Sequence, residues 1–145
     1  MLKGLDPILS PDLLHVLRSM GHGDEIVVAD ANFPADSMSQ KLVRLDGLSV
    51  TAVADAILSV MPLDDFVEAA AWRMEVVGDP DAEQPIFGEF REIIRRREGP
   101  RFTLASLERF AFYDRAEAAY AIVATGERRL YGNIVLKKGV VRPEG

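Results

Sequence analysis

Two kinds of hydrophobic pattern alternate along this chain of 145 residues. In one kind, apolar residues recur every three or four positions, as on one face of a helix, and in the other, short apolar runs are typical of buried strands. The helical pattern covers residues 10–20, 37–42, 49–61, 86–97 and 109–118, and the strand pattern covers residues 26–29, 43–45, 71–77, 104–107, 120–124 and 134–136. Because strands alternate with helices, the pattern predicts one α/β domain over residues 1–145, with a largely parallel sheet covered by helices on both faces.

Local signals mark several of these boundaries. Ser10 and Pro11 are typical of an N-cap followed by the first residue of a helix, and Gly21 is a natural stop after it. Ser49 is a second candidate cap. Residues 68–77 are ambiguous, because their alanines favour a helix while apolar and polar side chains alternate from residue 72 onward. We expect a strand over residues 71–77.

Charge and composition exclude several classes of protein. The net charge of −6 argues against a nucleic-acid partner, and the arginines at 95–97 are interpreted as the basic last turn of a solvated helix. The absence of cysteine excludes disulfides, thiolate metal sites and cysteine nucleophiles. The amino terminus lacks the apolar core of a signal peptide, and no apolar run reaches the ~20 residues that span a bilayer. A cytoplasmic protein without a membrane partner is therefore expected.

The first candidate site surrounds His22, which stands between Gly21 and Gly23 and leads into a short apolar run that ends at Asp30. Glycines on both sides let a ligand approach closely, and Asp30 follows a predicted strand, where ligands bind in parallel sheets. A Gly-His-Gly turn taken alone is more often a helix end than a catalytic site. The nearby acids lack the spacing of metal ligands, and glycines that precede a strand do not form a phosphate loop.

A second candidate group lies nearer the carboxyl end, in residues 109–116 and 126–133. Tyr131-Gly132-Asn133 offers a phenol, an accessible backbone and a carboxamide, which are the donors and acceptors that a polyhydroxylated ligand needs. The same triplet is equally compatible with a plain turn before a strand. Phe110 and Phe112 are expected in the core.

Taken together, these stretches resemble the ribose pyranase and L-fucose mutarotase family. Phe33-Pro34-Ala35, the segment 109–113 and Tyr131-Gly132-Asn133 are similar to the fucose branch. The matching positions, in chain order, are Met1 to Lys3, Ser10-Pro11, Leu17, Met20 to Ile26, Asp30-Ala31, Phe33 to Ala35, Asp46-Gly47, Arg109 to Tyr113, Thr125 to Glu127, Tyr131 to Ile134 and Leu136 to Gly139. Residues 62–104 depart most from the family pattern.

The resemblance implies that His22 is the proton donor and that Asp30, Arg109 and Tyr131-Gly132-Asn133 contact the sugar. It also implies ring-shaped homo-oligomers, commonly decamers, with sites near subunit boundaries. The reaction would open and reclose the ring of a monosaccharide by acid/base catalysis, for which no metal or redox cofactor is required. Asp30 would orient the imidazole or bind a hydroxyl, and Phe33 or Phe112 would face the methyl group of L-fucose. Pyranose to furanose interconversion of ribose and sugar binding without catalysis remain alternatives.

Overall fold

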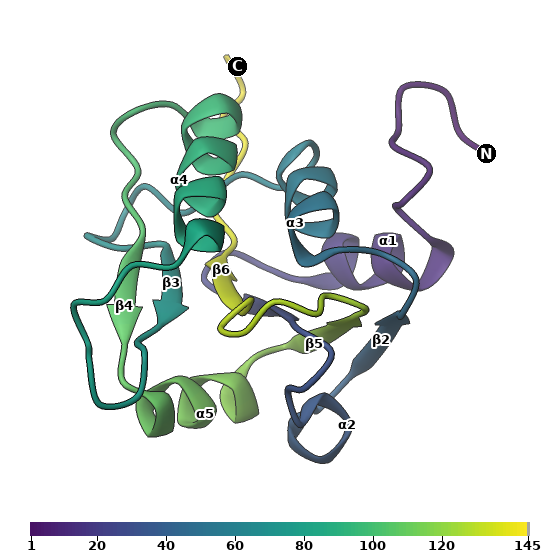
Figure 1. Ribbon diagram of the computed structural model, residues 1–145. Helices are drawn as coiled ribbons and strands as arrows, with labels where there is room; N and C mark the ends of the chain where they lie inside the picture. Colours follow the sequence, from purple (N-terminus) through teal and green to yellow (C-terminus); the bar gives the residue numbers. More distant parts are fainter. Residues whose placement is uncertain (145) are drawn as a thin grey trace.

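The computed structural model describes residues 1–144, which form a six-stranded sheet between two layers of helices (Figure 1). The helices are α1 (Pro11–Ser19), α2 (Ala35–Met38), α3 (Val50–Leu58), α4 (Pro85–Glu98) and α5 (Arg109–Ala118). The strands are β1 (Glu25–Ala29), β2 (Leu42–Leu45), β3 (Ala71–Met74), β4 (Ala105–Leu107), β5 (Ala121–Thr125) and β6 (Ile134–Lys137).

The sheet has the strand order β2-β5-β1-β6-β3-β4. Strand β6 pairs antiparallel with both β1 and β3, whereas the pairs β1 with β5, β2 with β5 and β3 with β4 are parallel. Within the described residues, β6 is therefore the strand that runs against the rest. The predicted largely parallel α/β sheet is confirmed.

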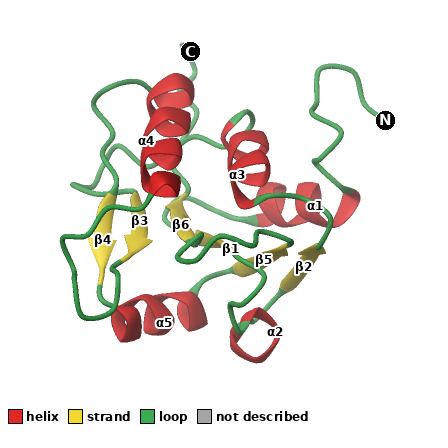
Figure 2. Ribbon diagram, in the orientation of Figure 1, coloured by secondary structure: helices red, strands yellow, loops and turns green. Residues whose placement is uncertain are grey.

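Helices cover both faces of the sheet, as predicted. Figure 2 shows α1, α3 and α4 on one side of the strands and α2 and α5 on the other. In β1, Ile26 and Val28 belong to the core beneath the first three helices, while Val27 and Ala29 belong to the core beneath the other two. Burial on both faces explains why this strand is continuously apolar rather than alternating.

Most predicted boundaries agree with the structure to within a residue or two. The Ser10 hydroxyl caps α1 by accepting from the Leu13 N–H at 3.3 Å, and the Ser49 hydroxyl caps α3 by accepting from the Ala52 N–H at 3.2 Å. Helix α4 ends at Glu98, before Gly99 with its φ of 99°. Helix α5 has the predicted bounds.

Three predicted elements differ from the structure. Helix α3 ends before Met61, because the Ser59 hydroxyl donates to the Ala56 carbonyl and the chain then tightens into a turn. Helix α2 lies earlier than predicted, because Leu42 is drawn into strand β2, where it pairs with β5. Strand β3 stops at Met74, because the segment that follows it turns back on itself.

The expectation that both phenylalanines of α5 lie in the core is wrong for one of them. Phe112 is fully buried, whereas Phe110 is 60% exposed. Residues two positions apart point to different sides of a helix, so α5 cannot bury both against one sheet.

The basic run at 95–97 forms the last turn of α4, as interpreted from the sequence. Arg95 pairs with Glu92 on the same helix, and Arg96 and Arg97 both pair with Asp55 of α3. Arg96 and Arg97 therefore join two helices of one layer. Among the described residues, no helix is long and apolar enough to cross a membrane.

Candidate functional site

Four of the residues singled out in the sequence line one pocket of about 230 Å³. Asp30 follows β1, Asn133 precedes β6, Arg109 opens α5 just after β4, and Tyr131 lies in the loop before β6. Because β6 is antiparallel to its neighbours, its start lies at the same edge of the sheet as the carboxyl ends of β1 and β4. This edge is where open α/β sheets bind ligands.

Asp30 is the buried polar centre of this pocket, with only 6% of its surface exposed. The Asn133 side chain bonds it twice, because its Oδ1 accepts from the Asp30 N–H at 2.8 Å and its Nδ2 donates to Asp30 Oδ2 at 3.1 Å. The Asn32 N–H donates to Asp30 Oδ1 at 3.0 Å. Burial raises the pKa of Asp30 above its ordinary value, although the hydrogen bonds from Asn32 and Asn133 oppose that rise. The carboxyl is thus held in one orientation before any ligand binds.

The Tyr131-Gly132-Asn133 triplet forms a strained turn. Tyr131 has a φ of 60°, which is unfavourable for a residue with a side chain, and its hydroxyl accepts from the Val77 N–H at 3.0 Å. At Gly132, a Cβ would stand 3.0 Å from the Glu127 Cγ and 3.1 Å from the Ile86 Cδ1. Glycine therefore lets the turn pack closely against α4.

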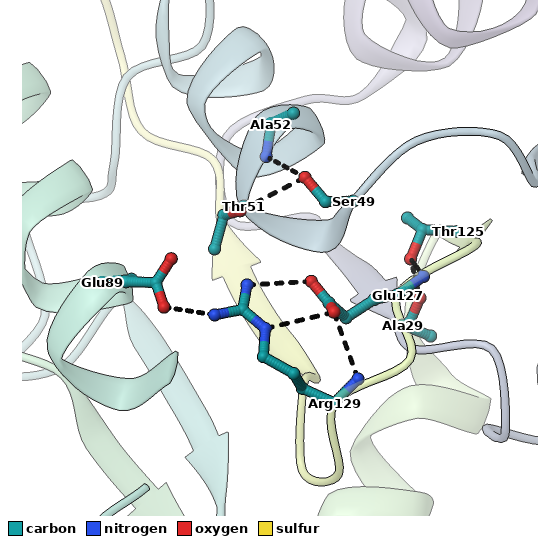
Figure 3. A network of polar contacts seen from close by, with 8 residues as sticks. All are labelled: Ala29, Ser49, Thr51, Ala52, Glu89, Thr125, Glu127 and Arg129. Carbon is teal, nitrogen blue, oxygen red and sulfur yellow. Dashed lines mark hydrogen bonds and ion pairs between the residues drawn. The ribbon is translucent and has the colours of Figure 1, made fainter. Parts of the chain in front are cut away.

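A polar network clamps this turn to the rest of the protein (Figure 3). Glu127 is 6% exposed, and one of its carboxylate oxygens accepts from the Arg129 guanidinium at 3.0 Å and the other from the Arg129 N–H at 3.1 Å. Arg129 also pairs with Glu89 on α4, and the Thr125 hydroxyl donates to the Ala29 carbonyl at 2.7 Å. The hydrogen bonds from Arg129 hold the pKa of Glu127 below its ordinary value despite burial. Glu127 and Arg129 fall within the second candidate group of the sequence, which assigned no role to either of them.

Arg109 brings an unsatisfied donor to the pocket wall. Its Nε is buried and has no hydrogen-bond partner in the described part of the chain. Its guanidinium stacks 4.6 Å from the ring centroid of the exposed Phe110. Buried donors are nearly always paired in folded proteins, so this unpaired one is unusual.

The remaining wall of the pocket is apolar. Phe33 lines it and packs edge to face against Phe112, with ring centroids 5.9 Å apart. Phe112 itself has no exposed surface and does not line the pocket, so of the two candidates for contact with a methyl group only Phe33 is placed for it. Met74, Val77 and Leu130 extend the apolar wall.

His22 does not belong to this pocket. It lies three residues before β1, whereas Asp30 follows that strand. A strand of five residues at about 3.3 Å per residue separates their backbones by roughly 15 Å. Within one chain, Asp30 therefore does not orient the His22 imidazole. The side chain of His22 is 44% exposed.

The partner of His22 is instead Asp64, which the sequence did not single out. His22 Nε2 lies 2.9 Å from Asp64 Oδ1, and the Asp64 side chain is only 3% exposed. The same oxygen accepts from the Phe66 N–H at 3.1 Å, and the Phe66 ring lies 5.0 Å from the imidazole. Burial raises the pKa of Asp64, but the hydrogen bonds from His22 and the Phe66 N–H, together with nearby positive charge including that of Lys137, hold the pKa below its ordinary value.

The segments around this pair are joined by the end of β6. The Asp64 N–H donates to the Lys137 carbonyl at 3.0 Å, and the Gly23 N–H donates to the Lys138 carbonyl at 2.9 Å. The Lys138 ammonium donates to the Leu17 carbonyl at 2.7 Å, which stabilises the carboxyl end of α1. The turn that carries His22 and the segment that carries Asp64 are thus held by the same strand.

Gly139→Ala is expected to lower the free energy of unfolding by about 1–3 kcal/mol through overpacking. A Cβ at this position would lie 2.4 Å from the Leu63 carbonyl oxygen and 2.8 Å from the Asp64 Cα, both backbone atoms that cannot rotate away. Urea denaturation measures the change. Gly47→Ala is the matched control, because a Cβ there meets nothing within 4 Å. Equal losses in the two variants would contradict the expectation.

Comparisons with known proteins agree with this arrangement. A sequence model of the RbsD / FucU transport protein family matches residues 3–141. The fucose mutarotase of Homo sapiens is 48% identical over 97% of this chain and 94% of its own length, and the L-fucose mutarotase of Actinobacillus pleuropneumoniae is 44% identical over 97% of both chains.

Solved structures are similar as well. The fucose mutarotase of Streptococcus pneumoniae in complex with L-fucose has a TM-score of 0.91 and 48% identity, covering 97% of this chain and all of the other. The Bacillus subtilis RbsD complexed with D-ribose, with a TM-score of 0.74 and 23% identity over 98% of this chain and 100% of its own, shares the fold. The resemblance inferred from the sequence is confirmed, and the chain belongs to the RbsD / FucU family.

Proposed function

We propose that this protein is an L-fucose mutarotase, an isomerase that interconverts the α and β anomers of L-fucose by acid/base-catalysed opening and closure of the ring. The observation that carries the proposal is the pocket in which Asp30, Asn133, Arg109 and Tyr131 face an apolar wall. The fucose mutarotases that are 44–48% identical over nearly the whole chain support it. Related monosaccharides are further candidate substrates.

Each part of the pocket matches a part of the sugar. Asp30 and Asn133 are prearranged to bind hydroxyl groups, and the guanidinium of Arg109, which lines the same pocket, is a further source of donors. The Tyr131 hydroxyl accepts from the Val77 N–H, so its own hydrogen is free to be donated to the anomeric oxygen. Phe33 faces the methyl group at the sixth carbon. A wall of this kind favours fucose over ribose, which has no methyl group.

The reaction needs a proton delivered to the ring oxygen and a proton removed from the anomeric hydroxyl. In our proposal His22 delivers the first proton, because an imidazole with an unperturbed pKa of about 6.5 can give and take protons at neutral pH. The proton of the anomeric hydroxyl passes to solvent water, while the Tyr131 hydroxyl donates a hydrogen bond to the oxygen that loses it. The chemistry moves protons only, so the proposal includes no metal or redox cofactor.

We further propose that the site is completed by a second copy of the chain, with His22 of one subunit facing the Asp30 pocket of another. Within one chain, His22 precedes strand β1 and Asp30 follows it, so they lie at opposite ends of the strands. Large apolar side chains are exposed at both ends, with Phe66 at 64% beside His22 and Phe110 and Leu130 at 60% and 64% near the pocket. Exposed apolar surface of this kind is typical of protein interfaces.

Contacts between two different surfaces repeat head to tail and form a ring when the rotation between neighbouring copies closes, which fits the proposed ring-shaped homo-oligomer, a decamer. We place this assembly in the cytoplasm. The absence of cysteine is consistent with that, since the fold gains nothing from an oxidising compartment.

Saturation-transfer NMR between the anomeric protons of L-fucose tests the proposed reaction. The protein is expected to accelerate transfer of saturation from one anomer to the other, and to do so more for L-fucose than for D-ribose. Greater acceleration with D-ribose would favour ribose pyranase activity. Line broadening of the sugar signals without accelerated exchange would indicate a sugar-binding protein without this catalytic activity.

A further inference from the structure

We propose that Asp64 is a positioning residue that holds the His22 imidazole in the tautomer with hydrogen on Nε2, so that Nδ1 is the atom that exchanges a proton with the substrate. The catalytic half of this inference rests on the proposed mutarotase function. The tautomer itself is a property of the folded protein and can be measured without any substrate.

The assignment of the tautomer follows from the hydrogen bonds at Asp64. Its Oδ1 receives the Phe66 N–H at 3.1 Å and lies 2.9 Å from His22 Nε2. An ionised carboxylate can only accept hydrogen bonds. The Asp64 carboxyl is ionised near neutral pH, as aspartates ordinarily are and as the hydrogen bond from the Phe66 N–H favours, so Nε2 must carry the hydrogen of this bond.

Nδ1 is then the nitrogen left for chemistry. In the neutral ring it is an unprotonated acceptor, and once it has taken a proton it becomes the donor. The imidazole is 44% exposed while its partner is 3% exposed, so the histidine is the side of the pair that a ligand or a second subunit can reach. Both protonation states of Nδ1 are used in a reversible ring opening, because the donor of one direction is the acceptor of the other.

Asp64 is fixed firmly enough to control the ring. Its N–H donates to the Lys137 carbonyl at 3.0 Å, and the N–H of the preceding Leu63 donates to the half-buried carboxylate of Glu98. The Phe66 ring packs against the imidazole at 5.0 Å on another side. The carboxylate therefore stays in place while the imidazole is held against it.

The alternative is that Asp64 and His22 form a surface ion pair with no catalytic consequence. The neighbouring Asp65 provides a control for this. Asp65 pairs with Arg142 at 2.7 Å and with Arg101 at 3.8 Å. It is an acid one position away from Asp64 that neither lines the pocket nor pairs with His22, so Asp65→Asn changes the same functional group outside the proposed pair.

The experiment combines the ¹⁵N NMR signals of the imidazole with the kinetics of anomer exchange. The chain has two histidines, so His22→Gln assigns the signals of His22. We expect Nε2 to carry the hydrogen in the unmodified protein and in Asp65→Asn. In Asp64→Asn this preference is lost, because a carboxamide can donate as well as accept.

For the kinetics, Asp64→Asn is expected to lower kcat about 10²-fold, within the range that positioned proton transfer contributes, with a much smaller change in KM. Asp65→Asn is expected to retain both constants. A hydrogen on Nδ1 in the unmodified protein, or an unchanged kcat in Asp64→Asn, overturns the inference. Absence of anomer exchange by the unmodified protein overturns the proposed function instead, and the nitrogen signals alone then decide whether Asp64 fixes the tautomer.

Discussion

His22→Gln is expected to lower the rate of L-fucose anomer exchange by about 10²–10⁴-fold, the contribution that a positioned proton donor typically makes. Glutamine can still donate a hydrogen bond to Asp64, but its amide does not titrate near neutral pH and cannot deliver a proton. The fold should be retained, because the side chain is 44% exposed and belongs to a turn held by β6. Saturation-transfer NMR at equal protein concentrations measures the loss.

His15→Gln is the matched control for this variant. His15 is the second histidine of the chain, and it lies exposed on α1 away from the Asp64 pair. It should keep the full exchange rate. A similar loss in both variants would mean that the effect does not come from proton transfer by His22, and no loss in His22→Gln would remove it from the mechanism.

Asp30→Asn is expected to abolish most of the affinity for L-fucose and to lower the free energy of unfolding by about 1–3 kcal/mol, the cost of leaving a buried polar group unpaired. The carboxyl accepts from the Asn32 N–H and from the Asn133 side chain in a buried site. The carboxamide has the same size, but its NH₂ group is a donor that would face the donors of Asn32 and Asn133. Titration of L-fucose followed by NMR measures the affinity, and urea denaturation measures the stability.

The matched control for this variant is Asp114→Asn, which makes the same chemical change at an exposed position of α5. It should leave both the affinity and the unfolding midpoint unchanged. If Asp30→Asn bound L-fucose as tightly as the unmodified protein, the pocket would not be the sugar site.

Much of the fold could be predicted because the helices and strands differ in hydrophobic period. The caps at Ser10 and Ser49 were readable as local chemistry, and both are present in the structure. The antiparallel direction of β6 could not be predicted, because the hydrophobic pattern of a buried strand is the same whether the strand is parallel or antiparallel to its neighbours. Phe110 was misplaced for a related reason, since apolar character alone does not say which side of α5 faces the sheet.

The site was predictable only in part. Asp30 stood out as a carboxylate at the end of a strand, and Tyr131-Gly132-Asn133 for its donors and acceptors, although 103 positions separate Asp30 from Asn133. The sugar-binding role of Arg109 came only from the family resemblance. Asp64 was missed, because it is one of many acids and lies 42 positions from His22 in the part of the chain that departs most from the family pattern. His22 and Asp30 are separated by β1, a strand of five residues. The sequence predicted this strand, but their separation was recognised only in the structure.

The central claim is that His22 of one subunit acts in the Asp30 pocket of another, and mixed oligomers test it most directly. Chains carrying His22→Gln and chains carrying Asp30→Asn are co-expressed in equal amounts, and the anomer exchange of L-fucose is compared with that of each variant alone. Half of the chains then have an intact His22 and the other half an intact Asp30 pocket. If each site combines the two from neighbouring subunits at random, about a quarter of the sites are intact, and about a quarter of the unmodified rate per subunit is expected. Exchange no faster than the average of the two separate variants would contradict the account.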